Sequence, residues 1–535
     1  MARLIVFNPE HDYALASARN TYTNPASLLM LKKRMVPNFL PLAGPGDLLL
    51  LPEHLSEEEE NVMRGNEELK EAGVTAVSHA DLKKKEYADC IKSILPWGWD
   101  FTLLNQLRKS SLPDHLFPSE KIIETIQSLS HRRTSIDFNN SFPEIEGIDP
   151  CVPVEFTNVE DAMNFLNTNK EVYFKAPWSS SGRGVINSST LSATALRQWI
   201  SGTINRQGSV IGEPAADRLL DFATEWKITD GEAEFLGFSL FSTDKTGHYR
   251  GNTPLSSAAI FEMIRESAPY FSMEVVEQQK KSIDRLISPY YSGPLGIDML
   301  VDKDGNVRPC VEINLRMTMG HVQLSRIPKV VIIGSGNVGT HLVSAFRKVA
   351  TIIPVNPRTL ADLPEDADYY IISVKDSAVE EISDKLPPVD AIVAHTSGSI
   401  GMEALSKHRN RGVFYPMQTF TKGKSLDYGE IPLFIEGNSP DCERKLTQLA
   451  SLVSNRVALA DSERRRKLHI AAVFSCNFVN RLCGIASDLL NDAGLDFKSM
   501  LPLIHETLNK LHELPAETAQ TGPAVREDKN VMDSH

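Results

Sequence analysis

The sequence predicts a multidomain α/β protein, and three observations support this fold class. The chain has 535 residues, whereas single hydrophobic cores stop growing at about 250 to 300 residues, so several domains are expected. Hydrophobic residues make up 41% and charged residues 23% of the sequence, as in folded globular proteins. The third observation is a change of pattern along the chain, from short alternating strands and helices to long strands, and then to a buried strand that leads into a helix.

Four segments carry these patterns. Residues 1–120 open with an apolar strand and are predicted to form a small α/β domain. Residues 121–326 contain longer strands with a hairpin signal, which favours a largely antiparallel α+β domain. Residues 327–455 alternate continuous apolar strands with helices, as in a doubly wound parallel sheet. Residues 456–535 read as helices only, and this all-α domain is a candidate surface for a homodimer.

Charge and cysteine content indicate which kinds of partner the protein can bind and in which cellular compartment it is expected. The 56 basic and 69 acidic residues give a net charge of −13, which argues against binding to nucleic acid. The six cysteines form no CxxC pair, and the N-terminus lacks the pattern of a signal peptide. No stretch approaches the roughly 18 consecutive apolar residues of a membrane span. We therefore expect a cytoplasmic protein that binds small molecules and neither nucleic acid nor membrane.

A loop of small and hydroxyl residues follows the strand predicted at residues 172–175. The loop contains Ser179, Ser180, Ser181, Gly182, Arg183 and Gly184, and Lys175 at the end of the strand adds a positive charge. The backbone N–H groups of the loop can lie against phosphate oxygens, because glycine permits positive φ angles and close approach. The spacing is not that of a Walker A loop. The alternative is an ordinary hairpin loop with a solvated lysine.

A second group of polar residues lies on the hairpin predicted at residues 296–316. Glu312, Asn314 and Arg316 share one face of an extended strand, and Asp298 on the facing strand can join them. Two carboxylates and an amide oxygen suit Mg²⁺, and arginine suits a phosphoryl group. The alternative is that this face of the sheet is simply turned to solvent.

The lysine with its loop, followed by the Asp…Glu-x-Asn-x-Arg hairpin, resembles the signature of the ATP-grasp family over residues 121–326. The resemblance implies an ATP-grasp domain preceded by a pre-ATP-grasp domain, and a ligase that uses MgATP to activate a small-molecule carboxylate as an acyl phosphate. It implies that Lys175 and the loop bind ATP, with Lys175 and Arg316 catalytic. It further implies that Glu213 lies near the adenine or ribose and that the Mg²⁺ ligands are Asp298, Glu312 and Asn314.

Two points about this half stay open. Family members place a lysine before the loop, where this chain has Ser130-His131-Arg132-Arg133, and arginine keeps the charge without the lysine geometry. Asn8, Glu10, His11 and Asp12 follow the first strand, where α/β sheets bind ligands, so they are candidates for substrate contact. A capping turn without a ligand explains them equally well.

A glycine-rich turn follows the apolar strand at residues 330–333 and opens a helix. Such a turn lets a pyrophosphate approach the backbone at a helix N-terminus, although a plain glycine turn is the alternative. Asn356 and Arg358 follow the second strand, where an arginine suits a 2′-phosphate and favours NADP(H) over NAD. The candidate dinucleotide-binding residues are therefore Gly334, Gly336, Asn337, Val338, Gly339, Asn356, Arg358 and Ser373.

Further motifs resemble a reductase-like family that joins a Rossmann domain to a helical domain of unknown function. These motifs are Ser373-Val-Lys375-Asp376, His395-Thr-Ser397, Tyr415-Pro416-Met-Gln418, residues 469–477 and Thr521-Gly522-Pro523. The resemblance implies a substrate pocket at the Rossmann strand ends, with His395, His469 and Asn477 as candidate catalytic residues. His469 is alternatively a satisfied core residue. The family usually continues into more helix, so the helical domain is expected to be truncated.

These inferences together predict a two-part enzyme. An MgATP-dependent carboxylate ligase-like half is joined to an NADP-dependent oxidoreductase-like half, and both act on small molecules. One alternative is a non-catalytic nucleotide sensor or scaffold. Another is an accidental fusion in which only the dinucleotide-binding half is functional.

Overall fold

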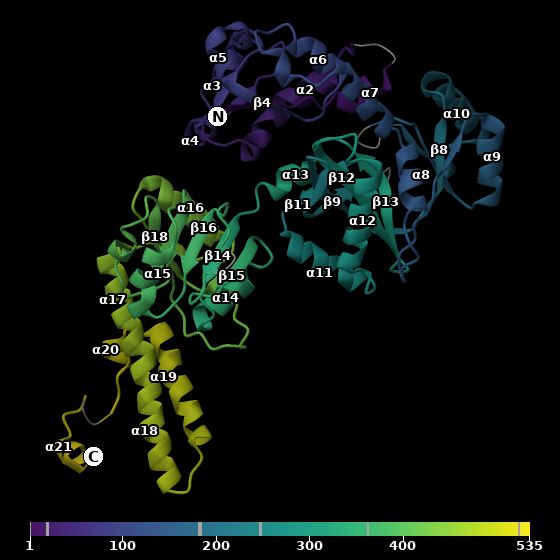
Figure 1. The fold of residues 1–535 in the computed structure, drawn as a ribbon. Coiled ribbons are helices and arrows are strands. Elements are labelled where there is room, and N and C mark those ends of the chain that lie inside the picture. Colours follow the sequence, from purple (N-terminus) through teal and green to yellow (C-terminus); the bar gives the residue numbers. More distant parts are fainter. Residues whose placement is uncertain are drawn as a thin grey trace. The chain divides into compact units, whose positions relative to one another are not determined.

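The computed structural model describes residues 2–17, 21–179, 184–244, 249–360, 363–522 and 525–534 (Figure 1). The chain divides into two compact units. The first comprises Met1–Ile332, Leu342–Pro354 and Leu363–Tyr369, and the second comprises Ile333–His341, Val355–Asp362 and Tyr370–His535. The mixed α/β architecture predicted from the sequence is confirmed.

The first unit begins with a parallel sheet in the order β3-β2-β1-β4. Its strands are β1 (Ala2–Val6), β2 (Leu48–Leu50), β3 (Thr75–Val77) and β4 (Ile91–Pro96). The accompanying helices are α1 (His11–Ala16), α2 (Ala26–Met35), α3 (Glu57–Arg64), α4 (Glu67–Glu71), α5 (Lys85–Cys90) and α6 (Phe101–Leu107). Helix α3 starts directly after Ser56 because Ser56 and Glu59 form a reciprocal capping box.

Two antiparallel sheets follow in the same unit. The smaller has the order β5-β8-β6-β7 and consists of β5 (Val154–Phe156), β6 (Val172–Lys175), β7 (Val185–Asn187) and β8 (Val210–Pro214). The larger has the order β11-β10-β9-β12-β13 and consists of β9 (Arg218–Thr229), β10 (Glu232–Thr243), β11 (Tyr249–Thr253), β12 (Gly293–Asp302) and β13 (Val307–Asn314).

Helices cover these sheets and close their cores. The helices are α7 (Glu120–Leu129), α8 (Arg133–Asn140), α9 (Val159–Thr168), α10 (Ala193–Gln207), α11 (Ser257–Ser267), α12 (Met273–Leu286) and α13 (Met319–Leu324). Figure 1 shows α9 and α10 beside β8. The apolar side chains of α11 and α12, such as Ile260 and Ile283, join Trp226 and Phe238 in one buried cluster under the larger sheet. This packing fixes the opposite face of the sheet, which carries the polar residues.

A mixed seven-stranded sheet follows, in the order β15-β14-β16-β17-β18-β19-β20. The strands are β14 (Lys329–Ile333), β15 (Thr351–Val355), β16 (Tyr369–Ile372), β17 (Ile392–His395), β18 (Arg411–Pro416), β19 (Leu433–Gly437) and β20 (Val457–Leu459). The intervening helices are α14 (Asn337–Phe346), α15 (Val379–Lys385) and α16 (Pro440–Ser451). Strand β19 pairs antiparallel with β18, and β20 pairs parallel with β19. The prediction that only helices follow residue 456 is wrong for β20, because three residues at a sheet edge leave almost no periodic signal.

The second unit ends in helices. Helix α17 (Ser462–Ala472) continues through a π-helical turn (Val473–Phe478) into α18 (Val479–Asp492), and α19 (Leu501–Glu513), α20 (Ala516–Ala519) and α21 (Lys529–Ser534) follow. The helices predicted for this segment are therefore present. By length and composition, Ser462–Asp492 is also a candidate membrane span among the described residues. That evidence is weak, because Arg481 and Asp488 lie within the apolar stretch.

Candidate functional site

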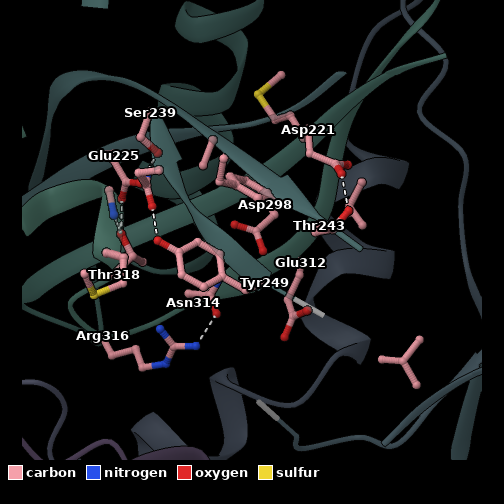
Figure 2. A pocket seen from close by; sticks show the side chains of 18 of the residues that line it. Asp221, Glu225, Ser239, Thr243, Tyr249, Asp298, Glu312, Asn314, Arg316 and Thr318 are labelled. Atoms are coloured by element: carbon pink, nitrogen blue, oxygen red, sulfur yellow. Dashed lines mark hydrogen bonds between the residues drawn. The ribbon is translucent and has the colours of Figure 1, made fainter. Parts of the chain in front are cut away.

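The first unit contains a cavity on the polar face of its five-stranded sheet (Figure 2). Strands β6, β9, β10, β12 and β13 supply most of the lining, and residues after β13 complete it. The cavity brings together five residues predicted from the sequence: Lys175, Asp298, Glu312, Asn314 and Arg316. Lys175 precedes Asp298 by 123 positions in the chain, so the fold brings distant parts of the sequence together at this site.

Asp298 and Glu312 face each other across the hairpin. They are register partners in the antiparallel pair of β12 and β13, and Asn314 pairs with Gly296 on the same face. Burial, together with the neighbouring Glu312 carboxylate, raises the pKa of Asp298 to about 7. Two carboxylates side by side in a half-buried position repel each other, so a divalent cation would favour their ionised form. The described residues contain no cluster of three or more His, Cys, Asp or Glu side chains arranged for a metal, and a site here would use two carboxylates and the Asn314 amide.

Arg316 is held beside these carboxylates by hydrogen bonds and by an aromatic ring. Its Nε donates to Asp12 Oδ2 at 2.9 Å and its Nη2 donates to Asn314 Oδ1 at 2.9 Å. Its guanidinium carbon lies 5.5 Å from the centroid of the Trp97 ring. Burial alone would lower the pKa of Arg316, but the carboxylates of Asp12, Glu312 and Asp298 together outweigh that effect and raise it. Arg316 is thus a permanently charged, fixed group in the cavity.

Lys175 and Glu213 form a buried ion pair on the smaller sheet. Lys175 Nζ lies 2.7 Å from Glu213 Oε2, and each side chain is 5% exposed. Tyr173 and Glu213 are register partners of β6 and β8, which places Glu213 next to the end of β6. Lys175 lines the cavity, whereas Glu213 lies behind it, holding the lysine.

The loop after β6 is described only at its two ends. Ser179 and Gly184 meet there: Gly184 has φ +78°, and a Cβ on it would lie 2.9 Å from the Ser179 Cβ. The loop mouth is closed by a hydrogen bond from the Ala176 N–H to the Gly184 carbonyl at 2.8 Å. The other candidate phosphate contacts, Ser180, Ser181, Gly182 and Arg183, lie outside the described residues.

Arg132 connects this loop to the carboxylate hairpin. Its Nη1 donates to Ser179 Oγ at 2.7 Å and to the Ala176 carbonyl, and its Nη2 donates to Glu312 Oε1 at 2.7 Å. The side chain is 6% exposed. Arg132 stands in the segment where the resembling family places a lysine, and the structure brings its charge to the predicted phosphate site.

Glu225 forms a second polar cluster at the wall of the cavity. Ser239 Oγ and Thr318 Oγ1 each donate to its carboxylate at 2.7 Å, and His321 Nδ1 lies 2.9 Å away. Burial alone would raise the pKa of Glu225, but His321 and the hydroxyl donors outweigh it and lower the pKa. This cluster holds the segment after Arg316 against β9.

The polar residues after β1 divide into two groups. Asn8 Nδ2 donates to Asp100 Oδ2 at 3.0 Å, His11 Nδ1 lies 3.4 Å from the same oxygen, and Glu10 pairs with Lys32 at 3.0 Å. These side chains are buried in an internal network. Of the four candidates for substrate contact, only Asp12 reaches the cavity residues, through Arg316.

The second unit has its own cavity, which the glycine turn lines. The lining includes the predicted residues Gly334, Gly336, Asn337, Val338, Asn356, Arg358, Ser373 and His469. Gly334 has φ +130°, and a Cβ on it would lie 2.0 Å from the Ser373 carbonyl oxygen. A Cβ on Gly339 would lie 2.4 Å from the Gly334 carbonyl oxygen, whereas one on Gly336 would have no neighbour within 4 Å. The turn therefore needs glycine for packing at two positions and leaves open space at the third, as dinucleotide binding requires.

The other predicted dinucleotide contacts surround this turn. Asn356 Oδ1 accepts from the Arg358 N–H at 3.0 Å, and the Arg358 side chain is exposed at the cavity. Asn337 Nδ2 donates to the Phe420 carbonyl at 3.0 Å. Ser373 is buried at the end of β16, where Thr396 Oγ1 lies 3.4 Å from its hydroxyl. Arg358 therefore lines the same cavity as the glycine turn.

The three candidate catalytic residues of this half have different surroundings. His395 is fully buried, with Nε2 3.2 Å from the Gly401 carbonyl and Nδ1 accepting from the Ser397 N–H at 3.2 Å. Burial lowers its pKa to about 4, so it is a neutral ring that shapes the loop after β17. Asn477 is exposed on the π-helical turn. Neither residue lines the cavity, whereas His469 does.

Sequence reasoning singled out neither Trp97 nor Tyr415 for a role. Trp97 follows β4 and reaches Arg316 only through the fold, so no local signal marks it. Tyr415 was visible as part of the motif Tyr415-Pro416-Met-Gln418 at a strand end, and its hydroxyl lies 3.1 Å from His469 Nδ1. Its position as a polar aromatic residue at the end of a strand was the signal that could have marked Tyr415 as a site residue.

Comparison with known proteins gives a family match for the C-terminal region. Residues 431–535 match the family described as Domain of unknown function (DUF2520). No curated protein matches the chain in sequence.

Solved structures resemble different parts of the chain. The "putative NADP oxidoreductase BF3122" of Bacteroides fragilis has 42% identity and a TM-score of 0.36, over 39% of this chain and 90% of that one. N5-carboxyaminoimidazole synthetase from Staphylococcus aureus, complexed with ADP, has 12% identity and a TM-score of 0.35, over 59% and 71%. Biotin carboxylase from Campylobacter jejuni has 14% identity and a TM-score of 0.38, over 61% and 68%.

The architecture agrees with the motifs in both units. A lysine-bearing antiparallel sheet and a carboxylate hairpin follow a parallel α/β domain in the first unit. A glycine turn between a strand and a helix precedes a helical region in the second. The chain thus joins a part whose sheets and motifs are similar to those of ATP-grasp enzymes to a Rossmann-like part that is similar to a putative NADP oxidoreductase, and its C-terminal region matches DUF2520.

Proposed function

We propose that the chain is a two-part cytoplasmic enzyme acting on small molecules. The first part is an MgATP-dependent ligase that activates a carboxylate, and the second is an NADP-dependent oxidoreductase. One observation carries the first proposal: Lys175, Asp298, Glu312, Asn314 and Arg316 line a single cavity. Their charges match those of a nucleotide triphosphate with its metal ion.

Each residue has a role that follows from its position. Asp298, Glu312 and Asn314 would hold Mg²⁺ through oxygen atoms, and Lys175 would contact the phosphates as a point charge. Arg132, which now pairs with Glu312, would contact a phosphate once Mg²⁺ neutralises that carboxylate. Arg316 would bind the reacting phosphoryl group or the substrate carboxylate. When bound, MgATP supplies the phosphoryl group that turns the carboxylate into an acyl phosphate.

Trapping with hydroxylamine tests this reaction without knowledge of the natural nucleophile. Hydroxylamine converts acyl phosphates to hydroxamates, so the protein is incubated with MgATP and a panel of amino acid and aliphatic carboxylates. We expect ADP release and a hydroxamate with at least one of them. Lys175→Ala should abolish both, whereas Lys303→Ala, which alters a lysine whose side chain is 65% exposed, should change neither. MgATP binding without carboxylate-dependent ADP release would favour the nucleotide sensor instead.

The second proposal is carried by the cavity beside the glycine turn. Gly336 leaves room for a pyrophosphate, and Arg358 is exposed at the same cavity. A fluorescence titration with NADPH and NADH tests it. We expect tighter binding of NADPH, and we expect Arg358→Ala to reduce that preference about tenfold, since one charged hydrogen bond is worth about 1.5 kcal/mol. Arg409→Ala, at an exposed arginine elsewhere in the unit, serves as the control.

The two activities could act one after the other on the same substrate, since an activated acyl group is a suitable substrate for reduction. Oxidation of NADPH that depends on ATP and a carboxylate would support cooperation. A mixture of separately expressed residues 1–326 and 328–535 should then work less efficiently than the intact chain. Equal rates would favour two independent activities on one chain.

A further inference from the structure

Tyr415 and His469 form a hydrogen-bonded pair in the cavity of the second unit. Tyr415 lies at the end of β18, and His469 lies on α17. The Tyr415 hydroxyl is 3.1 Å from His469 Nδ1, and the rings meet edge to face with centroids 6.0 Å apart. Both residues line the same cavity as Gly334 and Gly336. The pair is therefore accessible from the space that a dinucleotide would enter.

The loop after β17 is shaped around this pair. A Cβ on Gly398 would lie 2.6 Å from His469 Nδ1 and 2.8 Å from Tyr415 Cζ. Any larger residue would push the two rings apart, because distances below 3.0 Å are not tolerated between such atoms. Only glycine lets the loop approach the pair this closely.

Buried contacts fix the helix that carries His469. Arg465, one turn earlier on α17, is 1% exposed and pairs with Glu436 of β19. Its Nη2 donates to the Ile400 carbonyl at 2.6 Å, and Ser462 Oγ donates to Glu436 Oε2 at 2.9 Å. Arg465 is thus a positioning residue that ties α17 both to the sheet and to the loop near Gly398.

The geometry points to Tyr415 as the proton donor for reduction of a carbonyl or imine, with His469 supplying the replacement proton. This inference rests on the proposed function of the second part as an NADP-dependent oxidoreductase. Tyr415 is 8% exposed, its hydroxyl contacts the imidazole ring of His469, and the residue lines the cavity. A partly buried phenol beside an imidazole is suited to general acid catalysis.

The proposed step is balanced in atoms and electrons. When bound, NADPH supplies a hydride, which forms a bond to the carbonyl or imine carbon. The π electron pair moves to the oxygen or nitrogen, which takes the proton of the Tyr415 hydroxyl. His469 in its protonated form then donates the Nδ1 proton to the Tyr415 oxygen, and a proton taken up from bulk solvent restores His469, so one proton is consumed for each hydride transferred. The products are an alcohol or amine and NADP⁺.

Three variants of the full chain test this assignment. Tyr415→Phe removes the hydroxyl alone, and Tyr428→Phe is the matched control, because the buried Tyr428 hydroxyl has no hydrogen-bond partner among the described residues. His469→Asn can still accept a hydrogen bond near the Nδ1 position but cannot supply a proton. NADPH oxidation is followed with a panel of small aldehydes, 2-oxo acids and cyclic imines, and NADPH binding is measured separately by fluorescence.

The expected results distinguish a failure of the role assigned to Tyr415 from a failure of the proposed function. Wild type should reduce at least one probe. Tyr415→Phe should lower kcat at least a hundredfold and His469→Asn at least tenfold, while both bind NADPH within twofold of wild type. The ¹⁵N resonance of His469 Nδ1 should shift in Tyr415→Phe and stay unchanged in Tyr428→Phe, without any substrate. Failure of wild type to bind NADPH would refute the proposed function. NADPH binding with no probe reduced, or retained turnover in Tyr415→Phe, would overturn the assignment of Tyr415.

Discussion

At the scale of single residues, the pair of carboxylates at Asp298 and Glu312 determines how the first cavity responds to pH. Burial and Glu312 raise the pKa of Asp298 to about 7, well above its value of about 3.9 in an unfolded chain. The protonated form therefore stabilises the fold at low pH, and this contribution is lost as the pH rises through 7. A divalent cation should compensate for that loss, because it binds the ionised form.

Asp298→Asn tests this linkage. Without metal, the variant should gain stability over wild type as the pH rises from 5 to 8, on the order of 2 kcal/mol, measured as the melting temperature. Mg²⁺ with ATP should stabilise wild type more at pH 8 than at pH 5.5, and should stabilise the variant little at either pH. Asp304→Asn, on the exposed hairpin turn, should behave like wild type. A variant that follows the wild-type pH dependence would contradict the role of Asp298.

Arg132 provides a second prediction at this scale. It contacts Ser179, the Ala176 carbonyl and Glu312 through two nitrogens of its planar guanidinium, a geometry that the single nitrogen of a lysine does not reproduce. Arg132→Ala should raise the Kd of MgATP about tenfold to a hundredfold, since hydrogen bonds to charged groups are worth about 1.5–3 kcal/mol. Arg132→Lys should have an intermediate effect, and Arg133→Ala, whose side chain is 57% exposed, should have almost none. Calorimetric titration measures all three, and unchanged affinity in Arg132→Ala would argue against a phosphate contact.

The sequence predicted some site residues and missed others for a physical reason. Glu312, Asn314 and Arg316 lie at every second position of one strand, so their common face follows from local geometry. Trp97 and Asp12 follow strands of the N-terminal parallel sheet, more than 200 positions before Arg316 in the chain, and no local pattern encodes that contact. His395 illustrates the opposite error, in which a residue is predicted for the site but lies outside it. A polar residue at a strand end can make its hydrogen bonds within the loop that follows the strand.

At the scale of elements, the glycine turn after β14 combines two separable requirements. Gly334 must be glycine because of its φ of +130° and its contact with the Ser373 carbonyl, whereas Gly336 faces open space. Gly334→Ala should therefore destabilise the fold by about 2 kcal/mol or more. Gly336→Val should leave the melting temperature nearly unchanged but weaken NADPH binding at least tenfold. Thermal unfolding measures the stability of both variants, and fluorescence titration measures their affinity for NADPH. Normal NADPH binding by Gly336→Val would mean that the dinucleotide does not bind at this turn.

Elements with strong periodic patterns were predicted, whereas pairing at the sheet edge was not. The strands that became β6, β12, β13 and β14 have continuous or alternating apolar residues, and each is present close to its predicted position. The π-helical turn Val473–Phe478 and the antiparallel pairing of β19 depend on tertiary contacts. Sequence periodicity carries no information about either feature.

At the scale of the whole molecule, the helices after β20 expose more apolar surface than a soluble monomer usually tolerates. On α18, Leu482 and Leu489 are 63% and 67% exposed, and on α19 Leu503 is 63% exposed. Such a surface normally marks an interface. Charged residues Arg481 and Asp488 interrupt the apolar stretch of α18, which disfavours lipid and favours a protein partner with a polar rim.

A second copy of the chain is the expected partner, because symmetric homodimers are the commonest assemblies. Light scattering should then give twice the chain mass of 59.4 kDa. The double variant Leu482→Glu with Leu489→Glu should shift the protein to the monomer, because it would bury four carboxylates at a two-fold interface. Leu452→Glu, at an exposed leucine after α16 that is 45% exposed, should remain dimeric. A monomeric wild type that floats with phospholipid vesicles would instead assign the helical face to a membrane, and the dimer would be refuted.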